Sequence, residues 1–78
     1  MSAEELKEMS AEEKVRTAVR IAEELVLWKD TIHCLSTGAY GVRGADMLLT
    51  IYVERGADAV RAAQLRIKLL AESNSIAG

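Results

Sequence analysis

The sequence predicts an all-α protein in which a short N-terminal helix precedes an antiparallel hairpin of two long helices. The chain contains no proline and five glycines, so residues that interrupt helices are few. Half of its residues are apolar, and along most of the chain they recur at the spacing of one helix face. A chain of 78 residues encloses only one core, so we expect a single helical domain over residues 1–78.

The first part of the chain repeats the tetrapeptide Ser-Ala-Glu-Glu, at residues 2–5 and 10–13. In each copy a glutamate follows the serine by three residues, which is the spacing of a capping box at a helix N-terminus. The repeat predicts a short helix over about residues 3–9 and a second helix that begins at Ala11. The alternative is one continuous helix with Ser10 on its surface.

The second helix is expected over about residues 11–36, because neither glycine nor proline interrupts this segment. The sequence Ser36-Thr37-Gly38 then provides a helix end, with the glycine in the left-handed position after the last turn.

The last helix is expected over about residues 42–73, where Gly56 alone interrupts the run that follows Gly44. Leu49 and Val53 before Gly56 lie on the same helix face as Val60 and Ile67 after it. Because the apolar stripe keeps its phase, we predict one long helix, with a kink or a break at Gly56 as the alternative.

Both long helices carry more apolar surface than a hairpin can cover within one chain. The C-terminal half of the second helix is apolar nearly all round, and the last helix has a second apolar stripe opposite its first. An apolar face without an intrachain partner is typical of protein–protein contact, so we expect oligomerisation to complete the fold. The residues expected in the oligomer interface are Leu27, Trp28, Leu35, Met47, Ile51, Leu65 and Leu69.

The charge and the N-terminal sequence argue against several partners. A net charge of −2 provides no general attraction to nucleic acid or to an anionic membrane. The N-terminus is acidic where a signal peptide is basic, and no uncharged run is long enough to span a bilayer. We therefore expect a soluble, cytoplasmic chain that binds neither nucleic acid nor membrane.

The sequence also offers no arrangement typical of catalysis or of cofactor binding. One cysteine excludes an intrachain disulfide and a four-cysteine zinc site. His33 and Cys34 are adjacent, so on a helix their side chains point about 100° apart and do not form a catalytic pair. The glycines at positions 38, 41 and 44 lack the Gly-Lys-Ser/Thr sequence of a phosphate-binding loop. We expect no enzymatic activity, no cofactor, no metal and no small-molecule substrate.

The two serine caps, the absence of proline and phenylalanine, and the helices rich in Ala, Glu, Leu and Arg are similar to those of de novo designed helical proteins. The resemblance covers the whole chain and is one of style, without a diagnostic motif. The glycines and the second apolar faces resemble those of designed subunits that assemble into symmetric oligomers, including cage-like or capsid-like nanoparticles. This resemblance implies interfaces and no active-site residues.

Two functions follow as hypotheses. The first is a structural, self-assembling subunit that forms a symmetric homo-oligomer through its apolar helix faces, with a closed shell as one such assembly because two distinct faces allow two kinds of interface. The alternative is a helical binding module that presents its spare apolar face to a different protein.

Overall fold

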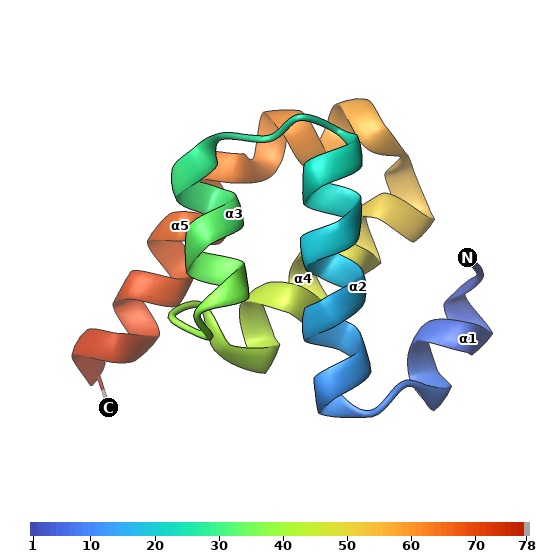
Figure 1. Cartoon of the computed structure of the whole chain (residues 1–78), viewed down its shortest axis with the longest axis horizontal. Coiled ribbons are helices and arrows are strands. Elements are labelled where there is room, and N and C mark those ends of the chain that lie inside the picture. Colours follow the sequence, from blue (N-terminus) through green and yellow to red (C-terminus); the bar gives the residue numbers. More distant parts are fainter. Residues whose placement is uncertain (78) are drawn as a thin grey trace.

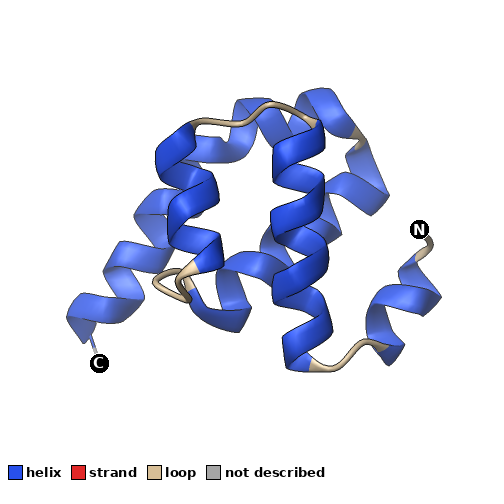
Figure 2. Cartoon of the chain, viewed as in Figure 1, coloured by secondary structure: helices blue, strands red, loops and turns tan. Residues whose placement is uncertain are grey.

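Five helices make up the computed structural model, which describes residues 1–77 and, of these, the side chains of residues 1–69. The helices are α1 (Ala3–Glu8), α2 (Ala11–Glu24), α3 (Lys29–Ser36), α4 (Gly41–Arg55) and α5 (Ala57–Ala77). The described residues contain helices and loops and no strand (Figure 2), so the all-α prediction is confirmed. None of their helices is both long and apolar enough to cross a membrane.

The two repeated serines begin helices as their spacing predicts. Ser2 and Ser10 are the N-caps of α1 and α2, and each side-chain oxygen accepts a hydrogen bond from the backbone N–H three residues on. Ser10 also donates to the carboxylate of Glu13 over 3.4 Å, so the second copy has a side-chain contact within the box as well. Met9, in extended conformation, separates the two helices, which excludes one continuous N-terminal helix.

The prediction of one helix over residues 11–36 is wrong, because the chain turns between α2 and α3 at residues 25–28. The N–H of Val26 donates to the carbonyl of Glu23 over 3.1 Å, and that of Leu27 donates to Ala22 over 3.0 Å. These two bonds form a Schellman motif, the common helix ending in which one residue adopts the left-handed conformation. Here that residue is Val26, with φ 55°, where glycine or asparagine is usual. The usual sequence signal for the helix end is therefore missing.

The last segment divides at Gly56, so the alternative to a single helix over residues 42–73 is confirmed and the single helix is wrong. Gly56 has φ 91° and ψ −179°, a backbone conformation that is accessible essentially only to glycine. Its N–H donates to Tyr52 in the last turn of α4, and its carbonyl accepts from Val60 in the first turn of α5. Leu49 before the break and Val60 and Ile67 after it are all buried, so residues of the predicted stripe pack inward from both helices.

The broken helices pack as two layers rather than as a hairpin of two long members. In Figure 1, α2 and α3 run in opposite directions side by side, while α4 and α5 cross behind them. Helix α4 contacts each of the other four helices, so it is the centre of the fold. Four of its residues, Gly44, Ala45, Leu48 and Leu49, are buried.

Gly44 allows the chain to fold closely at the start of α4. A Cβ atom at this position would lie 2.6 Å from the Cβ atom of Tyr40, whose buried side chain precedes the helix. No larger residue fits at position 44 without moving Tyr40. The apolar core that surrounds α4 consists of Leu6, Ala18, Ile21, Ala22, Leu27, Leu35, Tyr40, Ala45, Leu48, Leu49, Val60 and Ile67.

Candidate interaction surface

The structure divides the seven predicted interface residues into three groups. Leu27 and Leu35 are 4% and 1% exposed and belong to the core. Met47 and Ile51 are half-buried and pack against the core from α4. Trp28 is 52% exposed, and Leu65 and Leu69 are each 55% exposed.

The assignment of Leu27 and Leu35 to an interface between chains is therefore wrong. It assumed a straight helix over residues 11–36, whose C-terminal half carries more apolar surface than a hairpin can cover. The turn at residues 25–28 instead places Leu27 directly after the left-handed residue of the Schellman motif, a position that normally packs back on the preceding helix. The turn also folds α3 back alongside α2, so Leu35 is covered within the chain.

Leu65 and Leu69 form an apolar strip along the outer side of α5. They are four residues apart and so lie on one helix face, with the exposed Ala62 a further turn toward the N-terminus. The opposite side of α5 buries Val60 and Ile67 in the core. The strip therefore has no cover among the described residues of its own chain.

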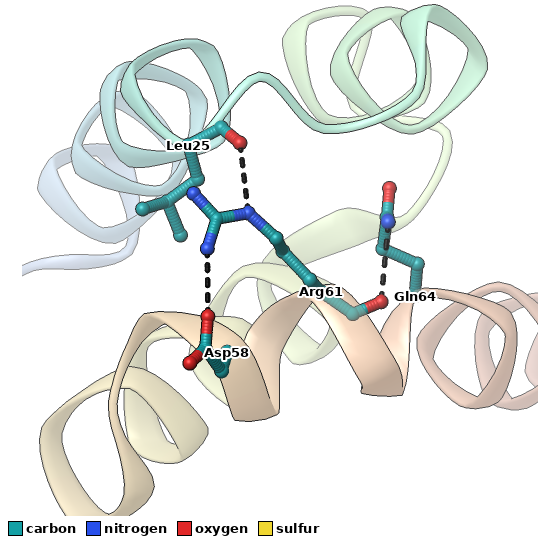
Figure 3. A network of polar contacts seen from close by, with 4 residues as sticks. All are labelled: Leu25, Asp58, Arg61 and Gln64. Atoms are coloured by element: carbon teal, nitrogen blue, oxygen red, sulfur yellow. Dashed lines mark hydrogen bonds and ion pairs between the residues drawn. The ribbon is translucent and has the colours of Figure 1, made fainter.

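Two side chains of α5 hold the α2–α3 turn, and Figure 3 shows the contact that Arg61 makes with it. The Nε of Arg61 donates to the carbonyl of Leu25, the C-cap residue that follows α2, over 3.2 Å. The Oε1 of Gln64 accepts from the N–H of Trp28, the residue that precedes α3, over 2.8 Å. Arg61 and Gln64, which we call the α5 clamp, thus satisfy one backbone group on each side of the turn.

Further polar contacts fix the geometry of this clamp. Asp58 forms an ion pair with Arg61 over 2.9 Å, and the Nε2 of Gln64 donates to the carbonyl of Arg61 over 3.2 Å (Figure 3). One turn further along α5, Lys68 forms an ion pair with Asp30 in the first turn of α3 over 3.2 Å. The start of α3 is therefore attached to α5 at two successive turns.

The clamp also joins the two segments that carry the three exposed apolar residues. Trp28 is bonded through its backbone to Gln64, and Leu65 is the next residue along α5. Leu69 follows Lys68, which holds Asp30 two residues beyond Trp28. We call Trp28, Leu65 and Leu69 the α5 apolar surface.

Sequence reasoning missed Val26, Arg61 and Gln64, although Gln64 carried a signal. It lies four residues after Val60 and three before Ile67, both buried, so it is a polar residue within an apolar stripe. A buried amide needs a hydrogen-bond partner, which indicates a backbone group from another element nearby. No comparable pattern marked Val26 or Arg61.

Possible chemical sites are few in the part of the chain that the structure describes. His33 is exposed and Cys34 is half-buried on α3, and no group of three or more His, Cys, Asp or Glu residues there is placed to hold a metal ion. A hollow of about 270 Å³ between α1, α2 and α4 is bordered by the ion pair of Lys14 with Asp46, which spans 3.0 Å. Lys7 and Glu54 also line this hollow.

No family model, no curated protein and no solved structure matches this chain. Its function is therefore inferred from its own surface.

Proposed function

We propose that this chain is a structural protein that self-associates through the α5 apolar surface, with a two-fold homodimer as the basic unit. The observation that carries the proposal is that Trp28, Leu65 and Leu69 are each more than half exposed, on two segments that the α5 clamp and the Lys68–Asp30 ion pair hold together. Large exposed apolar side chains that lie together are typical of protein–protein contact. Tryptophan in particular is enriched among residues that dominate binding energy.

A two-fold dimer requires only one surface, because the same patch serves both subunits. A closed shell requires a second interface, and part of the excess apolar surface expected on the helix over residues 11–36 is used inside the chain, through Leu27 and Leu35. The surface residues that remain therefore favour a dimer over a shell. The small net charge of −2 opposes self-association only weakly.

The apolar strip of α5 is suited to pairing with the same strip of a second copy of the chain. Leu65 and Leu69 are one turn apart, so two α5 helices in antiparallel contact place apolar side chains opposite each other. Arg66 is exposed beside this strip and can remain in water at the rim of such a contact.

The experiment is sedimentation equilibrium over a wide range of protein concentration, on the wild type and on the double variant Leu65→Glu/Leu69→Glu. We expect the wild-type mass to rise above the monomer value of 8.5 kDa with concentration, and the double variant to remain a monomer. Charges at both positions would have to be buried without partners in the dimer, which is strongly unfavourable.

The matched control is Val42→Glu, which places a charge at an exposed apolar residue on α4. It should leave self-association unchanged, and circular dichroism should show native helix content for both variants. A wild type that stays monomeric at all concentrations, or a double variant that associates as the wild type does, contradicts the proposal. A monomer of this kind would instead favour a binding module with a different partner.

A further inference from the structure

The α2–α3 turn has an unusual residue at its centre. Val26 is branched at Cβ and adopts a positive φ of 55°, which is unfavourable for L-residues and most of all for β-branched ones. Its side chain is 84% exposed, so no packing of that side chain compensates for the strain. The conformation is imposed on Val26 by the rest of the fold.

The local sequence favours a straight helix through this turn. Residues 11–36 contain neither glycine nor proline, and the turn itself, Leu25-Val26-Leu27-Trp28, contains no residue that favours the left-handed conformation. In a continuous helix the carbonyl of Leu25 and the N–H of Trp28 would bond within the helix, with partners four residues away.

The α5 clamp acts on just these two backbone groups. Arg61 bonds to the carbonyl of Leu25, and Gln64 bonds to the N–H of Trp28. Both bonds exist only while the chain is bent, because a continuous helix would occupy the same groups. The turn is thus strained locally and held by contacts that come from 36 residues further along the chain.

We propose that the α2–α3 turn is a hinge and that two copies of this chain exchange their α1–α2 segments to form a domain-swapped dimer. In the exchanged dimer, α2 and α3 join into one helix over residues 11–36. Short hinge loops under strain favour this exchange, because opening relieves the strain while the contacts within the fold are re-formed between chains.

The exchange divides the contacts of the monomer into those that would form between subunits and those that would stay within one subunit. Those between α2 and α3, α2 and α4, and α1 and α4 would form between subunits, and so would the ion pair of Lys14 with Asp46. The ion pair of Lys68 with Asp30 would stay within one subunit, because α3 and α5 lie on the same side of the hinge. The α5 clamp is lost. This dimer does not use Leu65 and Leu69, although the loss of the clamp releases Trp28 from Gln64.

The variant Lys29→Pro distinguishes the bent chain of the monomer from the continuous helix of the exchanged dimer. Lys29 is the exposed first residue of α3, where proline is well tolerated, and Trp28 before it has φ −56° and ψ 142°, a conformation compatible with a following proline. In a continuous helix the same proline would lie in the interior. We expect Lys29→Pro to weaken the exchanged dimer by more than about a hundredfold for each of its two hinges. Lys29→Ala is the matched control for loss of the charge and should leave the dimer unchanged.

We expect Gln64→Met to shift the equilibrium between the monomer and the exchanged dimer toward the dimer. It leaves the N–H of Trp28 without its acceptor in the bent chain but not in the straight one, so we expect the dimer constant to rise by about tenfold per hinge. Arg61→Met removes the other hydrogen bond of the clamp, and it replaces Gln64→Met in the experiment if that variant folds poorly. Asp30→Asn is the control, because it breaks a contact that both states share.

All variants are made with Leu65→Glu/Leu69→Glu, so that the dimer proposed above does not contribute. Each protein is equilibrated at high concentration near its unfolding temperature, cooled, and measured by light scattering and small-angle X-ray scattering. The hinge is supported if Gln64→Met or Arg61→Met forms a dimer and if adding Lys29→Pro to that variant abolishes the dimer. Its long helix of about 39 Å would exceed the 32 Å length of the monomer. The hinge is overturned if neither clamp variant dimerises, or if the dimer persists with Lys29→Pro.

Discussion

Val26 shows how a single residue can carry a conformation that its own chemistry disfavours. It occupies the position of the Schellman motif that glycine usually fills, with a positive φ and an exposed side chain. Leu27, the next residue, is buried in the core and fixes the direction in which the chain leaves α2. The burial of Leu27, together with the α5 clamp, thus offsets the strain at Val26.

We expect Val26→Gly to raise the free energy of unfolding of the monomer by about 1 kcal/mol. Glycine adopts the left-handed conformation without the steric cost that a β-branched residue meets there, and this gain exceeds the greater freedom of glycine in the unfolded chain. Urea unfolding at low protein concentration measures the change.

Val42→Gly is the control, since Val42 is exposed and lies in the first turn of α4 without a positive φ. There the same substitution should lower stability. A loss of stability at both positions would mean that Val26 is not strained.

Gly44 is the opposite case to Val26. Here the lack of space beside Tyr40, and not the backbone angle, requires a glycine. The approach of the Tyr40 Cβ atom leaves no room for a side chain at position 44. The structure places this close approach at the start of α4.

At the scale of helices, the two glycines that end α3 and α4 work in different conformations. Gly38 follows the C-cap Thr37 with φ 81°, the left-handed position that the sequence predicted. Gly56 combines φ 91° with extended ψ and connects α4 directly to α5. Asparagine tolerates the first conformation but not the second.

Gly38→Asn and Gly56→Asn therefore form a matched pair. We expect Gly38→Asn to change the unfolding free energy by less than about 0.5 kcal/mol and Gly56→Asn to lower it by about 1–3 kcal/mol. Apart from the adjacent residues, no atom lies within 4 Å of a Cβ built at either glycine, so clashes with other parts of the fold do not confound the comparison. Thermal unfolding of both variants decides the matter, and equal losses would count against a special conformation at Gly56.

Helix beginnings were predictable where the signal was local. Ser2 and Ser10 cap α1 and α2 because a serine and the backbone three residues later suffice to form the cap. The beginning of α3 was not predictable, since Trp28 provides no side-chain cap and its N–H is satisfied by Gln64, which is distant in the sequence.

At the scale of the whole molecule, α4 organises the core because it touches every other helix. Leu49 on α4 is fully buried, whereas Leu69 on α5 is more than half exposed. The same residue type thus has a structural role in one place and a proposed interaction role in the other.

Leu49→Ala should lower the unfolding free energy by about 2–5 kcal/mol, because it leaves a cavity at the centre of the fold. Leu69→Ala should lower it by less than about 1 kcal/mol in the monomer, where the side chain remains in contact with water. Urea unfolding at low concentration compares the two variants. Similar losses would show that Leu69 is buried in the monomer and would remove it from the α5 apolar surface.

The sequence by itself determined the helical class, the caps at Ser2 and Ser10, the helix end at Gly38, and the inward face that Leu49, Val60 and Ile67 share. These features depend on residues within a few positions of one another or on the helix period. Only the tertiary structure decided that the chain turns at Val26 and that Leu27 and Leu35 are internal. The turn depends on Arg61 and Gln64, and the free energy of burying Leu27 and Leu35 exceeds the strain of one unfavourable backbone angle. Such a balance between distant contacts and local preference is not visible in any window of the sequence.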